Sequence, residues 1–159
     1  MTITVEQEGV GAPDMVALLQ LHLEEAVANS PACAVHALAL EGLRAPGITF
    51  WTAREQGDLL GFGALLQLSD CAGEIKSMRT YPTHLRRGVG AMILGEIIDL
   101  ARVLELKTLH LETGNTPHFH PAHHLYRQFG FEWSGAFADY TGSEFSRFMK
   151  LDLGKPADS

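Results

Sequence analysis

The segment from residue 74 to residue 94 carries the pattern with the clearest chemical meaning in this 159-residue sequence. It reads as an extended strand, a basic turn with Arg86 and Arg87, and the start of a helix. Gly88 and Gly90 allow the backbone to approach a ligand closely, and the first amide N–H groups of a helix have no partner within the helix. These amides and the two arginines favour an anion. The spacing therefore predicts a site for a phosphate-bearing cofactor.

Two common phosphate-binding turns do not fit this segment. A Walker A loop needs a lysine followed by serine or threonine after two widely spaced glycines, and the sequence contains no such run. A dinucleotide-binding turn needs a third glycine where Ile93 stands, and it begins directly after its strand. Glu112 does lie at a suitable distance for a ribose-binding acid. A dinucleotide site is thus disfavoured rather than excluded, and nucleoside triphosphate hydrolysis is not expected.

The composition of the chain predicts one globular domain over residues 1–159. Hydrophobic residues make up 46% of the sequence, which is enough to fill a core at this length. The formal net charge of −7 argues against a general nucleic-acid binder. No segment has the pattern of a secretory signal or a membrane span, so we expect a cytoplasmic protein. Cys33 and Cys71 are too few for a disulfide framework and lack zinc or redox spacing.

Hydrophobic periodicity predicts a mixed α/β fold. Amphipathic patterns indicate helices over residues 14–28 and 30–43, and two strands at 48–54 and 59–68 are expected to form a hairpin. A strand, the helix after the glycine turn and a second strand form a βαβ crossover, whose two strands must run parallel. The other expected boundaries are strands at 3–5, 107–113, 131–133 and 146–153, and helices ending near residue 105 and spanning 121–129.

Two sequence landmarks resemble the GNAT superfamily of acyl-CoA-dependent N-acyltransferases. The first is Leu85-Arg86-Arg87-Gly88-Val89-Gly90, in which Leu85 stands where the family prefers a polar residue. The second is Leu125-Tyr126 followed by Gly130-Phe131, one crossover later. The resemblance covers most of the chain and is strongest to small bacterial single-domain members. It implies a twisted, mostly antiparallel sheet of roughly six to seven strands, a splayed parallel central pair and about four helices.

The resemblance also implies a role for individual residues. Tyr126 matches the general acid, since a phenol with a pKa near ~10 keeps its proton until a thiol with a pKa near ~8.5 has left as thiolate. The alternative is an aromatic ring that fills the core against Phe129 and Phe131. Asn115 could bind the pantetheine amide, although a turn-forming asparagine is the simpler interpretation. The implied cofactor contacts are Met78, Arg79, Thr80, Arg86, Arg87, Gly88, Val89, Gly90, Ala91 and Asn115.

The general base and the histidines leave more than one hypothesis open. Glu74 and Glu112 lie on strands beside the expected groove, with Asp139 in reserve, but each glutamate could equally be a surface carboxylate, and a water chain could replace them. Four of the eight histidines lie between residues 117 and 124. A metal site is possible there, but no glutamate separates the i, i+4 pair as in metalloproteases, so we expect no metal and favour histidines near the acceptor entrance.

These observations predict an enzyme that transfers an acetyl group from acetyl-CoA to a primary amine of a small molecule or peptide. The transfer would be direct, in a ternary complex. The alternatives are a non-catalytic acyl-CoA-binding or sensing module and, less favoured, a metal-dependent hydrolase built on the histidines. Residues 28–46 and 136–145, which would select the acceptor, carry no recognisable code. A homodimer is possible by analogy with relatives.

Overall fold

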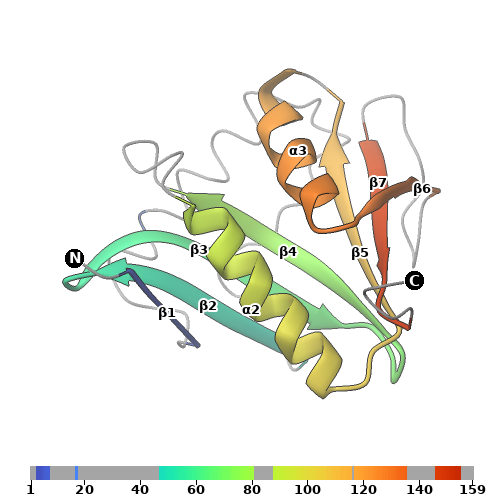
Figure 1. Ribbon diagram of the computed structural model, residues 1–159, viewed down its shortest axis with the longest axis horizontal. Helices are drawn as coiled ribbons and strands as arrows, with labels where there is room; N and C mark the ends of the chain where they lie inside the picture. The colour runs from blue at the N-terminus through green and yellow to red at the C-terminus, as the bar shows by residue number, and fades with distance from the viewer. Residues whose placement is uncertain are drawn as a thin grey trace.

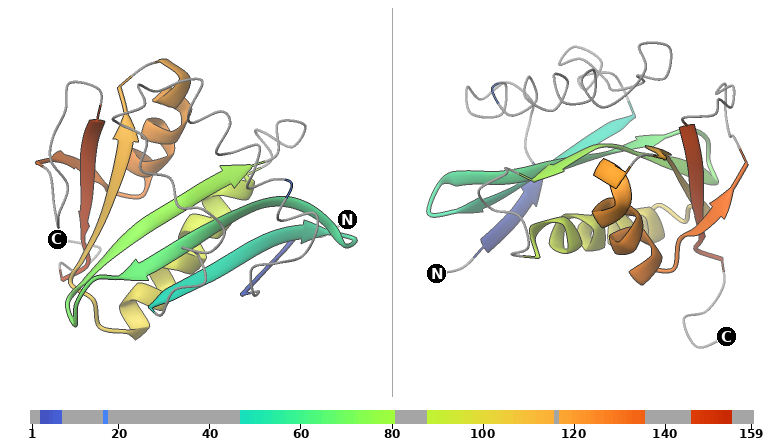
Figure 2. Two further views of the ribbon diagram at one scale, coloured as in Figure 1. Left: turned by 180° about the vertical axis from the view of Figure 1, so that it is seen from behind. Right: turned by 90° about the horizontal axis from the view of Figure 1, so that it is seen from above.

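The structure is a computed structural model that describes residues 3–7, 17, 47–80, 88–115, 117–135 and 146–154. A twisted seven-stranded sheet forms one layer, in the order β1-β2-β3-β4-β5-β7-β6. Two helices, α2 and α3, cover the same face of this sheet (Figures 1 and 2). The strands are β1 (Ile3–Gln7), β2 (Ile48–Glu55), β3 (Asp58–Gln67), β4 (Ala72–Thr80), β5 (Thr108–Gly114), β6 (Glu132–Ser134) and β7 (Ser146–Asp152), and the helices are α2 (Val89–Val103), α3 (His120–Gln128) and the short 3-10 helix η4 (Pro117–Phe119).

This architecture confirms the predicted fold class, and the predicted strands occur with ends shifted by one or two residues. Of the helices expected over residues 14–28 and 30–43, the structure describes only residue 17, which is helical. The hairpin of β2 and β3 is present and closes through Gln56 and Gly57, whose φ angles of 52° and 85° suit a tight two-residue turn. None of the described helices is long and apolar enough to cross a membrane.

The β4–α2–β5 segment is the predicted crossover, and its two strands run parallel. They pair over three positions only: Ala72 with Thr108, Gly73 with Leu109, and Glu74 with His110. Beyond these residues the strands diverge, and Figure 1 shows the widening gap between them. Every other neighbouring pair in the sheet is antiparallel. The only parallel pair among the described strands is therefore also the one that opens.

Helix α2 packs its apolar face against this sheet. Six residues are buried: Val89, Ile93, Leu94, Ile97, Ile98 and Ala101. By helical spacing Leu104 would continue this apolar face, but it is 39% exposed, because the helix ends at Val103 and Glu105 turns the chain with a φ of 60°. At Gly63 on β3, a Cβ atom would lie 2.7 Å from Cγ2 of Ile93. The close approach of helix and sheet is thus provided by a glycine on the strand.

Candidate functional site

The site begins with the gap between β4 and β5. Along residues 75–80 of β4 and 111–114 of β5, no ladder pairing joins the two strands. Strand β5 pairs with β7 along its whole length, which fixes one side of the gap. Backbone N–H and C=O groups on such edges can bind an extended ligand as an added strand would. The gap therefore suits a long, thin molecule with amide groups.

A bulge interrupts the pairing of β3 and β4 beside the gap. The register shifts between Phe62 and Ala64, so that β4 carries one extra residue. Met78 packs against the core, and a Cβ atom at Gly63 would lie 3.2 Å from Cγ of Met78. The resemblance placed Met78, Arg79 and Thr80 beside the cofactor. The structure describes their backbone as strand and leaves the side chains of Arg79 and Thr80 outside its description.

The N-terminus of α2 has the geometry of an anion site. Gly88 caps the helix with a φ of 79°, a left-handed conformation that favours glycine. The first helical hydrogen bond runs from the amide of Met92 to the carbonyl of Gly88, at 3.0 Å. The amides of Val89, Gly90 and Ala91 precede it and thus have no acceptor within the helix. No acidic side chain lies in the first turn. Arg86 and Arg87, predicted for the same cradle, lie outside the described residues.

Gly90 brings α2 and α3 together. A Cβ atom at this position would lie 3.1 Å from Cδ2 of Leu125 on α3. The sequence suggested that Gly90 lets the backbone approach a ligand, and the structure adds that it lets one helix approach the other. Residue Tyr126 follows Leu125 directly. The expected phosphate cradle and the expected general acid are therefore in neighbouring helices at the same end of the sheet (Figure 1).

Tyr126 is buried in the hydrophobic core. Its side chain is 8% exposed, and its ring centroid lies 5.7 Å from that of Phe131 in a tilted arrangement. Burial raises the pKa of Tyr126 to about 12, because the charged phenolate is poorly solvated there. The ring thus has the packing role that the sequence offered as an alternative. Its hydroxyl nevertheless keeps its proton at neutral pH and can act as a donor.

The two candidate bases are in different environments. Glu74 is 3% exposed and forms an ion pair with Lys76, with Nζ and Oε2 3.0 Å apart. The hypothesis that Glu74 is a surface carboxylate is therefore wrong. Glu112 is half-buried on β5, beyond the last residue that pairs with β4. Asn115, expected to contact pantetheine or form a turn, is exposed directly after β5. Asp139 lies outside the described residues.

His110 is a polar residue of this site that the sequence hypotheses missed. It pairs with Glu74 in β4 and with Lys150 in β7. Desolvation lowers its pKa most, the charge of Glu74 opposes this, and Lys150 lowers the pKa further. Leu109 and Leu111 are buried in the core, so strand alternation puts His110 and Glu112 on the opposite face. The alternation of residues 108–112 could have indicated that His110 shares a face of β5 with Glu112.

The histidine-rich segment divides between the interior and the surface. His123 is 9% exposed and hydrogen-bonds the Gly114 carbonyl, whereas His124 is exposed and contacts Gln128 at 3.3 Å. The helix expected from residue 121 begins one residue earlier, so that His120 is the first residue of α3 and Phe119 is the cap. Within the ranges that the structure describes, no three histidine, cysteine or acidic residues are grouped to hold a metal ion. The side chain of His118 is not described.

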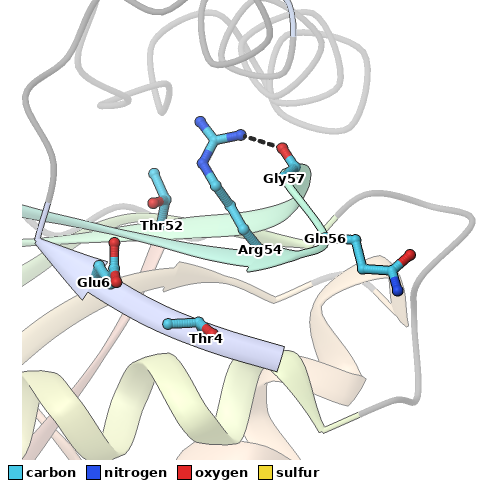
Figure 3. Close-up of a pocket in the computed structure, with 6 residues that line it drawn as sticks. All are labelled: Thr4, Glu6, Thr52, Arg54, Gln56 and Gly57. Atoms are coloured by element: carbon cyan, nitrogen blue, oxygen red, sulfur yellow. Dashed lines mark hydrogen bonds between the residues drawn. The ribbon is translucent and has the colours of Figure 1, made fainter. Parts of the chain in front are cut away.

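A separate polar cavity of about 290 Å³ lies at the β1 and β2 edge of the sheet (Figure 3). Arg54 lines the cavity and donates a hydrogen bond from Nη1 to the carbonyl of Gly57 at 2.9 Å. In Figure 3, Glu6, Thr52 and Arg54 point away from α2. Strands β3 and β4 separate this cavity from the gap beside β5. The cavity is lined by Thr4, Glu6, Thr52, Arg54, Gln56 and Gly57, none of which the sequence singled out.

Comparisons with known proteins agree with this geometry. The Acetyltransferase (GNAT) family model matches residues 15–131. The uncharacterized N-acetyltransferase YsnE of Bacillus subtilis (strain 168) is 47% identical over 139 residues, which cover 87% of this chain and 92% of that protein. YedL of Escherichia coli (strain K12), also described as an N-acetyltransferase, is 41% identical over 150 residues and 94% of each chain.

A solved structure shows the same fold over nearly the full length. The crystal structure of a protein described as an acyl-CoA N-acyltransferase, from Klebsiella pneumoniae, superposes with a TM-score of 0.75 at 26% identity. The match covers 95% of this chain and 97% of that chain. The splayed β4–β5 pair, the glycine-capped helix and these similarities lead to one conclusion. The chain belongs to the GNAT family and is an acyl-CoA-dependent N-acetyltransferase.

Proposed function

We propose that this enzyme transfers an acetyl group from acetyl-CoA to a primary amine of a small molecule or peptide, by direct attack in a ternary complex. The observation that carries the proposal is the opening of β4 and β5 beside the Gly88-capped start of α2. A pyrophosphate needs unpaired amides and no nearby carboxylate, and the first turn of α2 offers both. A pantetheine arm needs an unpaired strand edge, which residues 78–80 of β4 offer.

The proposed cofactor contacts divide between these two elements. The pyrophosphate is bound through the backbone amides of Gly88, Val89, Gly90 and Ala91. Because any residue has a backbone amide, the loss of the polar side chain that the family prefers at Leu85 is tolerated. Arg86 and Arg87 add charge from the segment just before the helix. Met78, Arg79 and Thr80 offer backbone groups to the pantetheine and to the thioester carbonyl, and Asn115 lies at the end of β5 on the other side of the gap. No metal takes part in this proposal.

Tyr126 is the proposed donor to the leaving sulfur. In the reaction the C–S bond of the thioester breaks and its electron pair goes to the sulfur. With a pKa of about 12 for Tyr126 and near ~8.5 for a thiol, equilibrium leaves the proton on the phenol. Its role is thus to stabilise the developing thiolate by a hydrogen bond, while solvent supplies the proton of the final thiol.

Glu112 is the proposed base. Acyl transfer requires an ammonium to lose a proton before its nitrogen forms the new C–N bond, and a carboxylate or a water bound to it can accept that proton. Glu74 is already ion-paired with Lys76, at 3.0 Å, and almost fully buried. Glu112 is half-buried where the strands have separated, so it is the better placed of the two.

The net negative charge of the protein favours a positively charged acceptor, although it does not identify that acceptor. The formal net charge of the chain is −7, and an amine substrate is positively charged at neutral pH. We further propose that the enzyme acts in the cytoplasm and as a homodimer through its C-terminal strands. β6 is an edge strand of the described sheet, as such an interface requires.

The proposal is tested by measuring thiol release from acetyl-CoA with a panel of amines, amino acids and peptides. For the amine that reacts, Tyr126→Phe should lower kcat about 100-fold, the usual scale for a lost hydrogen-bond donor to developing charge, because the donor to sulfur is gone. Acetyl-CoA affinity, measured by calorimetry, should change little. If no amine releases thiol and acetyl-CoA does not bind, the proposed function is wrong. If Tyr126→Phe leaves kcat unchanged, another residue is the donor.

A further inference from the structure

We infer that His123 is a positioning residue for catalysis: it ties α3 to the end of β5 and thereby fixes the hydroxyl of Tyr126. This inference rests on the proposed role of Tyr126 as donor to the leaving sulfur. It also gives a function to one member of the histidine-rich segment, for which the sequence offered only a metal site or an acceptor entrance.

The hydrogen bond of His123 defines its protonation state. Nε2 lies 2.9 Å from the carbonyl oxygen of Gly114 and 3.1 Å from Oγ1 of Thr113. A carbonyl can only accept, so Nε2 must carry the hydrogen and donate it. Desolvation lowers the pKa of His123 most, and the charges of His120 and Arg147 lower it further, against the hydrogen bond to Gly114. The ring is therefore neutral at pH 7, with its proton on Nε2.

Packing fixes the plane of the His123 ring. The side chain is 9% exposed, and the ring meets Trp133 of β6 edge-on, with centroids 4.9 Å apart. Trp133 in turn has the guanidinium of Arg147 over its ring, 4.0 Å from the centroid. Arg147 lies on β7, where it pairs with Thr113 of β5. The contacts thus form a closed circuit through α3, β6, β7 and β5.

The position of His123 on α3 connects this circuit to Tyr126. His123 and Tyr126 are the two buried residues of the helix, and three positions separate them, so they share one face. Gly114 and Thr113 end the strand that borders the gap. A shift of α3 along this strand would move the Tyr126 hydroxyl relative to the thioester, and a displacement of about 1 Å can cost up to ~100-fold in rate.

Two substitutions of His123 separate the effect of its hydrogen bond on catalysis from the effect of its ring. His123→Phe keeps an aromatic ring against Trp133 and removes the N–H, whereas His123→Gln removes the ring and keeps an N–H near the position of Nε2. We expect His123→Phe to lower kcat about tenfold with the KM for acetyl-CoA changed less than about twofold. His123→Gln should recover most of the lost kcat. The matched control is His124→Gln, an exposed neighbour on the same helix, which should behave as wild type.

A double-mutant cycle decides whether His123 acts through Tyr126. In a Tyr126→Phe background, His123→Phe should cause no further loss of kcat. The inference is overturned if the loss is the same in both backgrounds, or if His123→Phe raises the KM for acetyl-CoA and leaves kcat unchanged. If His123→Phe does not fold, His123→Asn replaces it in the cycle, because its shorter amide cannot reach Gly114.

The outcomes also separate this inference from the proposed function. A protein that does not bind acetyl-CoA, or whose kcat is unaffected by Tyr126→Phe, contradicts the proposed role of Tyr126 and the inference with it. A protein in which Tyr126→Phe is impaired and His123→Phe is not contradicts the inference alone.

Discussion

The two helices on the sheet are held in different ways. Helix α2 buries six apolar side chains and contacts four strands, from β1 to β4. Helix α3 buries only His123 and Tyr126, and its described hydrogen bonds to β5 run through one imidazole. The helix that would bind the phosphates is thus held by its buried apolar surface, and the helix that carries the proposed donor Tyr126 is held by a few directed contacts. Stability and catalysis should therefore respond to different substitutions.

The largest effect on stability should come from the α2 core. Ile97 is fully buried, and Ile97→Ala should lower the free energy of unfolding by about 2–5 kcal/mol, through lost burial and a residual cavity. Urea titration followed by circular dichroism measures this change. The rate per folded molecule should stay near wild type. Val103→Ala, at a position 76% exposed on the same helix, should change stability by less than ~0.5 kcal/mol. Equal losses for the two variants would contradict the packing described for α2.

Alanine substitutions of two glycines of α2, Gly88 and Gly95, should change stability by smaller amounts and in opposite directions. Gly88 has a φ of 79°, so Gly88→Ala should cost about 1–2 kcal/mol in backbone strain even though open space surrounds it. It should also weaken acetyl-CoA binding, because the relaxed turn moves the amides of the first turn. Gly95→Ala is the control, since Gly95 lies inside the helix with open space around it and should stabilise by ~0.5–1 kcal/mol. A stabilising Gly88→Ala would show that this turn is not strained.

The sequence predicted the strands and the crossover well, because each depends on local patterns. Alternation marked the hairpin, and the glycine turn marked the start of α2. The failures depend on tertiary contacts that no local pattern records. Leu104 continued the helical period, yet the chain turns at Glu105 and exposes it. Gly63 looked like an ordinary strand glycine and proved to be the contact point for Ile93, which lies 30 positions further along the chain.

The sequence predicted the backbone features of the site better than the environments of its side chains. The Gly88 turn and the parallel pair that opens were expected from spacing and resemblance. The burial of Glu74 and its ion pair with Lys76 were not, because strand alternation alone does not tell which face of a sheet is covered. The segment 117–124 suggested metal ligands by residue type. Only the position of Gly114 in space shows that His123 donates to a backbone carbonyl.

The smallest expected effect is on the pH dependence of stability. Burial lowers the pKa of His123 and of His110 in the folded protein below the ordinary value of 6.5. As pH falls through 6.5, the unfolded chain therefore binds protons first, and the free energy of unfolding decreases until the folded pKa values are passed. Urea titrations between pH 7.5 and 5 should show this loss. His123→Gln should lose less over the same range, and an equal loss would contradict the buried, neutral state of His123.

The central claim is that acyl-CoA lies in the gap between β4 and β5 with its phosphates on α2. Amide hydrogen exchange with and without acetyl-CoA tests it most directly, because it reports on each backbone segment. The account predicts slower exchange on adding acetyl-CoA in residues 75–80, 88–91 and 111–114, and little change in β1 or β2. Unchanged exchange in these three segments under saturating acetyl-CoA, or protection confined to the cavity at β1 and β2, would contradict it.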